Sequence, residues 1–216
     1  MSDTMSRYKP FPIALHWLTL LLLIAVYACI ELREFYPKGS DPRNALKSWH
    51  FMLGLSVFGL TLLRLVMRWM NPPPAKAASI GYWQRLFSSV MHVALYALLL
   101  AMPMLGWAVL SGEGKAVIWL GLELPALIAP DKALAESLKG LHEIVGTSGY
   151  FLIGFHALAG VYHHYFQRDN TLLRMLPACS NSRYPSVIRA SQACEGFDFY
   201  GHNHTLQALK ACPNTA

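Results

Sequence analysis

Four long apolar runs constrain this 216-residue chain more than any other feature of its sequence. Each run has about the 20 residues that an α-helix needs to cross the hydrocarbon core of a bilayer. Backbone polar groups inside lipid must bond within their own segment, so each run is expected to be a helix. We therefore predict an all-α fold, a transmembrane four-helix bundle embedded in a lipid bilayer. The runs cover residues 12–31, 48–67, 88–110 and 141–166.

Composition and charge exclude several other classes of protein. Hydrophobic residues make up 54% of the chain and charged residues only 14%, against about 25% charged residues in soluble domains. The net charge of +6 comes from cations scattered between the apolar runs, so membrane orientation explains it better than nucleic-acid binding. The 4 cysteines form no C-x-x-C pair, which argues against a disulfide scaffold, a zinc ribbon and covalent c-type haem.

The domain organisation is simple, because the connections between the runs are short and punctuated by Pro and Gly. Residues 1–176 are expected to form one membrane domain, and residues 177–216 a polar, loosely ordered cytoplasmic tail. Cysteines and histidines in this tail are too irregularly spaced to favour a metal site over a solvated segment. Of the 18 Lys and Arg residues, 11 fall on the side of the N-terminus, so both termini are expected in the cytoplasm. The first apolar run is expected to stay as a helix rather than to be cleaved as a signal peptide.

Seven of the nine histidines lie in or at the ends of the predicted helices, where ionisable side chains are costly and usually functional. His142 and His156 are 14 residues apart on the fourth helix, about 21 Å along its axis and nearly on one face. His16 is one turn into the first helix and matches the depth of His156, and the two are called the inner pair. His50 is one turn into the second helix and matches the depth of His142, which makes the outer pair.

Two neutral imidazoles that face each other are the ligand set of six-coordinate haem b in a helix bundle. We therefore expect two haem b groups, with His16, His50, His142 and His156 as ligands of the haem iron. Histidines that only form hydrogen bonds between helices, and a zinc or proton transporter, are the alternatives. Three glycines each follow a predicted ligand by four residues, on the face where a side chain would strike a porphyrin. They are Gly54, Gly146 and Gly160.

Four further residues are candidates for supporting roles around the haem groups. His92, on the third helix, lies at the depth of the inner pair and is a candidate to contact a quinone or a propionate there, or to replace a ligand. Arg64, on the second helix at the same depth, can extend to the interface or pair with a haem propionate. His163 and His164 end the fourth helix, where they either anchor it at the interface or exchange protons with a quinone.

Several stretches of the chain resemble the bacterial dihaem cytochrome b561 family, within a wider group of membrane cytochromes b that also includes hydrogenase subunits. The matching stretches are His16-Trp17, residues 31–37, Trp49-His50 with Gly54, residues 63–65 and, most specifically, residues 149–166 and 169–175. The resemblance spans about residues 5–177 and implies a four-helix bundle with two haem b groups on the same four histidines. It also implies electron exchange with ubiquinone in the bacterial inner membrane.

Members of that family are associated with superoxide oxidation, so the resemblance implies a superoxide:ubiquinone oxidoreductase. Cations in the first outer connection would draw superoxide toward the outer pair, although acids in the same connection limit this attraction to a local one. The cations are Arg33, Lys38, Arg43 and Lys47. The alternative function is a non-catalytic electron-transfer anchor that links quinone to a partner dehydrogenase or hydrogenase. Short loops, which provide little docking surface, favour the oxidoreductase.

Overall fold

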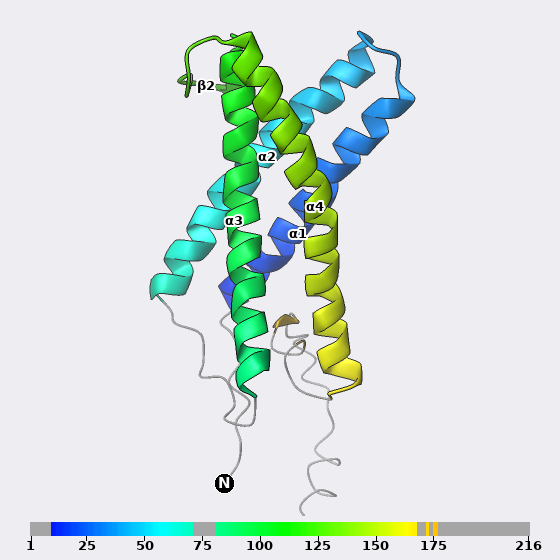
Figure 1. Ribbon diagram of the computed structural model, residues 1–216, viewed down its shortest axis with the longest axis vertical. Helices are drawn as coiled ribbons and strands as arrows, with labels where there is room; N and C mark the ends of the chain where they lie inside the picture. The colour runs from blue at the N-terminus through cyan, green and yellow to red at the C-terminus, as the bar shows by residue number, and fades with distance from the viewer. Residues whose placement is uncertain (1–9, 71–80, 168–171, 173–174, 177–216) are drawn as a thin grey trace, which may run out of the picture. The chain divides into compact units, whose positions relative to one another are not determined.

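The computed structural model describes residues 10–70, 81–167, 172, 175 and 176 of the chain. Within these residues the four predicted helices are confirmed, and each is longer than its apolar run (Figure 1). A 3₁₀ turn, η1 (Arg33–Phe35), follows the first helix. The helices are α1 (Pro10–Leu32), α2 (Asp41–Met70), α3 (Tyr82–Gly112) and α4 (Lys132–Tyr165). The predicted tail from residue 177 onward lies outside the described residues.

Helix α4 begins nine residues before its apolar run because Asp131 caps it. The Asp131 carboxylate accepts hydrogen bonds from the backbone N–H groups of Ala133 and Leu134, both at 3.0 Å. These bonds satisfy donors of the first turn that have no partner within the helix. Polar caps of this kind extend a membrane helix beyond the hydrocarbon layer, and the apolar run alone does not reveal them.

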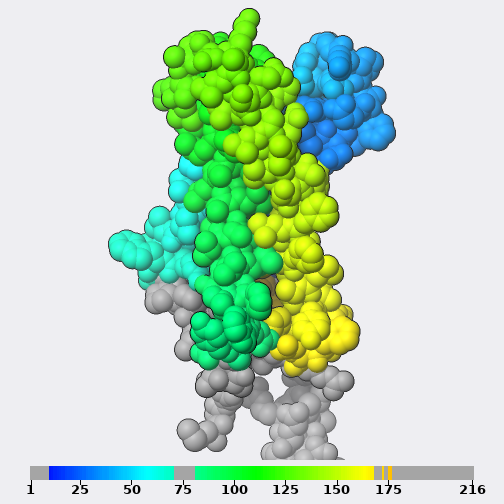
Figure 2. Space-filling view, viewed as in Figure 1, coloured from blue at the N-terminus to red at the C-terminus, as the bar shows by residue number. Residues whose placement is uncertain are grey.

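All four helices are long and apolar enough to cross a membrane. Large apolar side chains project from them away from the protein interior, such as Leu21, Phe155 and Leu158 with 62%, 62% and 65% of their surface exposed. Figure 2 shows α3 and α4 side by side along one face. Apolar surface that is not covered by protein needs lipid to cover it, so the exposure agrees with a multi-pass membrane protein.

The buried hydroxyl side chains inside the bundle satisfy their own hydrogen bonds, whereas the buried Nδ1 of His142 has no partner within the described residues. Thr19, Thr61 and Ser111 are almost fully buried, and each donates its hydroxyl to the carbonyl four residues earlier, at 2.7 to 2.9 Å. Small hydroxyl residues can therefore pack between membrane helices without leaving an unpaired group in a medium of low polarity.

Neighbouring helices run antiparallel, so α1 begins and α4 ends at the same end of the bundle (Figure 1). Two hydrogen bonds connect elements at this end. The Trp17 indole N–H on α1 donates to the carbonyl of Met175 at 2.7 Å, and the Gln84 side-chain amide on α3 donates to that of Gln167 at 2.7 Å. We call this the inner end, and the opposite end, with the α1–α2 and α3–α4 connections, the outer end.

A short hairpin between α3 and α4 adds two strands to the expected all-α fold. Strands β1 (Val117–Trp119) and β2 (Leu122–Leu124) are antiparallel. The two-residue turn has positive φ at Leu120 (49°) and Gly121 (83°), the conformation that suits the twist of a tight hairpin. Val117 is buried against α2 and α3. Three-residue strands carry no measurable periodicity, so the sequence pattern did not predict them.

Candidate functional site

The structure brings both predicted histidine pairs together. His50 on α2 and His142 on α4 form the outer pair, with ring centres 6.1 Å apart and ring planes at 75°. His16 on α1 and His156 on α4 form the inner pair, at 6.3 Å and 71°. Helix α4 therefore contributes one histidine to each pair, and two different helices provide the partners.

The separation within each pair suits a metal ion held between two imidazole rings. A metal–nitrogen bond is about 2 Å long and the ring centre lies about 1 Å behind the nitrogen, so two rings on opposite sides of one ion are about 6 Å apart. The observed 6.1 and 6.3 Å match this spacing. The donor set is two imidazole nitrogens on different helices, which suits the iron of haem b. The residues therefore fit the expected cofactor.

His50 forms a hydrogen bond through Nδ1, which leaves its second ring nitrogen, Nε2, available as a ligand. Its Nδ1 lies 3.0 Å from the carbonyl oxygen of Val26 on α1. A carbonyl only accepts, so Nδ1 carries the proton and Nε2 keeps its lone pair. Backbone carbonyls commonly orient metal-binding histidines in this way. Helix α1 therefore positions a ring of the outer pair although it contributes no ligand to that pair.

A cavity of about 470 Å³ surrounds the outer pair, within the range of about 300–1,000 Å³ typical of cofactor and ligand sites. All four helices and β1 line it, mostly with apolar side chains such as Leu99, Met102 and Trp107. The lining also includes charged side chains. A lining of this composition would exclude water from the ring of a large flat cofactor and would provide charges for its polar edge.

The predicted glycines differ in their surroundings. Gly54 lines the cavity, and no atom lies within 4 Å of the position that a Cβ would take there. Gly160 has equally open space. At Gly146, which also lines the cavity, a Cβ would lie 3.2 Å from the Met102 methyl group. Open space beside a ligand helix is compatible with a porphyrin at Gly54 and Gly160, while Gly146 serves close packing with α3.

Sequence reasoning missed Gly106 on α3. A Cβ at Gly106 would lie 3.4 Å from Cε1 of His142, so the His142 ring packs against α3 at this glycine, where a side chain larger than a methyl group would meet it. The available signal was a glycine three residues after Pro103 in the middle of an apolar run. No spacing rule connects that glycine to a histidine 36 residues away, because only the packing of α3 on α4 brings them together.

The inner pair belongs to a larger cluster. The His92 ring on α3 lies 5.5 Å from that of His156, and its Nδ1 is within hydrogen-bond distance of the Ser88 carbonyl. Arg64 on α2 donates from Nη2 to Nδ1 of His16 at 3.2 Å. The guanidinium has no acceptor, so His16 Nδ1 holds a lone pair here and the ring differs in tautomer from His50. A lone pair on Nε2 of His16, which iron binding needs, would place the proton on Nδ1. Nδ1 could then no longer accept a hydrogen bond, so Arg64 would need another acceptor.

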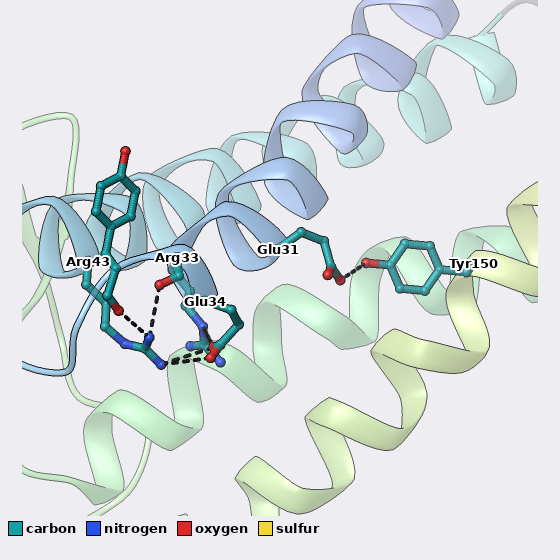
Figure 3. Close-up of polar contacts among 6 residues, drawn as sticks. Glu31, Arg33, Glu34, Arg43 and Tyr150 are labelled. Atoms are coloured by element: carbon teal, nitrogen blue, oxygen red, sulfur yellow. Dashed lines mark hydrogen bonds and ion pairs between the residues drawn. The ribbon is translucent and has the colours of Figure 1, made fainter.

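Arg43 has a different place from the one expected of a superoxide-steering cation. It is 8% exposed, and its guanidinium donates to the carbonyls of Arg33 and Tyr36, both at 2.9 Å, and to the Glu34 carboxylate at 3.0 Å (Figure 3). Arg33 also contacts Glu34, at 2.9 Å. Arg43 therefore connects the start of α2 to η1 and the residue after it, and its charge is compensated. Lys38 is exposed and does not line the cavity.

Two tyrosines connect α1 to α4 beside the cavity. The Tyr150 hydroxyl donates to Glu31 at 2.6 Å (Figure 3), and the Tyr27 hydroxyl donates to the Gly146 carbonyl at 2.9 Å. Gly149 is required at this crossing, because a Cβ there would collide with the Tyr27 hydroxyl. These contacts hold α4 against α1 between the two histidine pairs.

His163 and His164 lie at the inner end of α4, away from the outer cavity. Both are half-buried, and each has an aromatic neighbour in sequence, with ring centres 6.2 Å apart for His163 and Tyr162 and 4.9 Å apart for His164 and Tyr165. This aromatic setting is typical of residues at a membrane interface.

Comparison with known proteins tests the family assignment directly. The sequence profile of prokaryotic cytochrome b561 matches residues 7–178. The chain belongs to the prokaryotic cytochrome b561 family. It is 38% identical to cytochrome b561 homolog 1 of Escherichia coli K12 over 173 residues, which cover 80% of this chain and 98% of that protein. It is 36% identical to the probable superoxide oxidase CybB of Yersinia pestis over 171 residues, covering 79% and 96%.

A third relative, cytochrome b561 homolog 2 of E. coli K12, is 27% identical over 184 residues, which cover 83% of this chain and 96% of that protein. The family match includes all four helices and both histidine pairs. Membership establishes a membrane cytochrome of the b type that transfers electrons, and it confirms the family resemblance read from the motifs. The chain beyond residue 178 lies outside the match.

Proposed function

We propose that this cytochrome b561 binds two haem b groups, one at each histidine pair, and transfers electrons from superoxide to ubiquinone. The observation that carries the proposal is the presence of two pairs with ring centres 6.1 and 6.3 Å apart, stacked along α4. The histidines on α4 are about 21 Å apart along the axis, so the two pairs occupy the two halves of the membrane. The printed name of the Yersinia pestis relative supports the choice of superoxide.

The protein itself supplies ligands, orientation and an apolar surrounding. When bound, haem b accepts and releases single electrons. His50 keeps the lone pair of Nε2 because the Val26 carbonyl holds its other nitrogen, and we assign the same ligand role to His16, His142 and His156. With a haem at the inner pair, Arg64 would exchange His16 for a propionate, since a carboxylate is a stronger partner for a guanidinium than a neutral imidazole.

The overall reaction requires two superoxide ions for each quinone. Each superoxide loses one electron and becomes dioxygen, and ubiquinone takes up two electrons and two protons to become ubiquinol. We place superoxide at the outer end, where Lys38 contributes positive charge, and leave out Arg33 and Arg43 because both are paired with Glu34. Proton exchange with ubiquinone is assigned to His163 and His164 at the inner end. The outer end then faces the periplasm of a bacterial inner membrane, with both termini in the cytoplasm.

A haem count with single histidine variants tests the ligand assignment. Pyridine haemochrome analysis of the purified chain should give two haem b per chain. His50→Ala and His142→Ala should both lose the same absorption component, and His16→Ala and His156→Ala should both lose the other. His92→Ala is the matched control from the same cluster and should keep both. Loss of a haem in His92→Ala together with retention in His16→Ala would replace His16 by His92 in the inner pair.

A kinetic experiment tests the choice of substrate. Superoxide should rapidly reduce the haem groups of the purified protein with ubiquinone present, superoxide dismutase should abolish the reaction, and added salt should slow it by screening the attraction. Slow reduction that does not depend on salt would favour the alternative, an anchor subunit that passes electrons between quinone and a partner dehydrogenase or hydrogenase. Co-purification of an iron–sulfur protein would favour it as well.

A further inference from the structure

The two histidines of the outer pair share a local pattern. Lys47 precedes His50 by three residues on α2, and Lys139 precedes His142 by three residues on α4. Residues three apart lie on neighbouring positions of one helix face, about 4.5 Å apart along the axis. Both helices start at the outer end (Figure 1). The two lysines are therefore both about one turn closer to the outer surface than the imidazoles that they precede.

Both lysines line the outer cavity, and their ammonium groups are available to bind a ligand there. Within the described part of the chain, neither Lys47 nor Lys139 has an acidic partner within 4.0 Å. Most other charges of the lining are engaged. Glu34 is bound by two arginines, Glu113 by Lys115 at 2.6 Å, and Glu31 by the Tyr150 hydroxyl.

Glu143 is the remaining acid of the lining. It follows Lys139 by four residues, but lies beyond ion-pair distance from it in the described structure. An order of Lys before Glu along a helix is the weaker arrangement for such a pair. The cavity therefore presents two ammonium groups, from two different helices, that can bind anionic groups on a ligand held between the histidines.

A ligand that matches this arrangement has a metal at its centre and two carboxylates along one edge. The porphyrin of haem b has two propionates on one side of its ring. We propose that Lys47 and Lys139 bind the two propionates of the outer haem and thereby turn the propionate edge of the porphyrin toward the outer surface. The inference rests on the proposed function, because it requires a haem at the outer pair.

The inner pair lacks the pattern. One turn further toward the inner end, the corresponding positions are Ile13 on α1 and Ala159 on α4, and Arg64 is the cation beside that pair. The pair of Lys47 and Lys139, which we call the lysine clamp, is therefore specific to the outer haem. Two positive charges near this haem stabilise its reduced form, which has one positive charge fewer than the oxidised form. The clamp is expected to raise the reduction potential of the outer haem only.

The test combines protein variants with a chemically modified ligand, in the manner of a double-mutant cycle. Full-length protein is loaded with haem b or with its dimethyl ester, in which both propionates are neutral. Retention at the outer pair is read from the absorption component that His50→Ala removes. The wild type should retain haem at least about tenfold better than the ester, and Lys47→Met combined with Lys139→Met should abolish this preference.

Two variants and one potential measurement complete the test. Replacement of both lysines by arginine should keep the preference, because the charges remain. Lys115→Met is the matched control and should keep it as well, since Lys115 is engaged by Glu113. In redox titrations the double Met variant should lower the potential of the outer haem and leave that of the inner haem unchanged. A double Met variant that still discriminates against the ester would overturn the clamp, whereas a wild type without haem at the outer pair would overturn the proposed function itself.

Discussion

Replacement of Arg43 by lysine separates a structural role of this residue from an electrostatic one, because the charge is kept and the guanidinium geometry is lost. Arg43 contacts two backbone carbonyls, both at 2.9 Å, and the Glu34 carboxylate from a side chain that is 10% exposed. A lysine has one terminal nitrogen and cannot reach all three acceptors from the same position. If Arg43 served only to attract superoxide, Arg43→Lys would leave the free energy of unfolding almost unchanged.

The expected loss follows from the broken contacts. One charge-assisted hydrogen bond to a backbone carbonyl contributes about 1.5–3 kcal/mol, and the Glu34 contact is left out because water screens a half-exposed carboxylate. We therefore expect Arg43→Lys to lower the free energy of unfolding by about 2 kcal/mol, which corresponds to a fall in Tm of about 4–8 °C for a chain of this length.

Thermal unfolding of the detergent-purified protein, followed by circular dichroism and haem absorbance, measures this shift. Arg33→Lys is the matched control from the same turn, since Glu34 is the one polar partner of the Arg33 side chain among the described residues and this side chain is 26% exposed. Its Tm should change by less than about 2 °C. Equal Tm values for Arg43→Lys and the wild type, or an equal loss in both variants, would refute the structural role assigned to Arg43.

Substitutions at three further positions probe the helix contacts around the site. Gly149→Ala should lower the free energy of unfolding by about 1–3 kcal/mol, because the new methyl group displaces the Tyr27 hydroxyl. An unchanged Tm would show that the Tyr27 side chain can shift without loss of stability. Gly106→Val should displace His142 and thereby remove the absorption component of the outer pair, while Gly106→Ala should keep it. Equal spectra of the two variants would contradict the packing of His142 against Gly106. Trp17→Phe should lower the free energy of unfolding by about 1 kcal/mol, because the hydrogen bond to Met175 is lost. An unchanged Tm would show that this hydrogen bond does not stabilise the inner end.

Much of the bundle could be predicted because a bilayer restricts what a chain can do. Each apolar run had to become a helix, and a helix converts residue number into depth at a constant rise. The pairing of His16 with His156 and of His50 with His142 followed from this depth, and the structure brings the same histidines together. Neither step needed knowledge of how the helices pack.

Residues whose role depends on a neighbouring element were predicted less well. Arg43 looked like one cation among several in a loop, because sequence cannot show that its guanidinium turns inward to η1 and the residue after it. Gly106 had no recognisable partner until α3 packed against α4. The hairpin of β1 and β2 is too short for a periodic pattern, and tertiary contacts of Val117 hold it in place.

The amino-acid sequence by itself determined the number of long apolar helices and the relative depth of the paired histidines, because these properties depend only on local hydrophobicity and on the rise of a helix. Only the tertiary structure decided which side chains meet at each depth: Arg64 at His16, Gly106 at His142, and the two lysines on the outer cavity. Rotation of a helix about its own axis and its tilt against a neighbour are set by side-chain packing between helices, and this information is distributed over residues far apart in the chain.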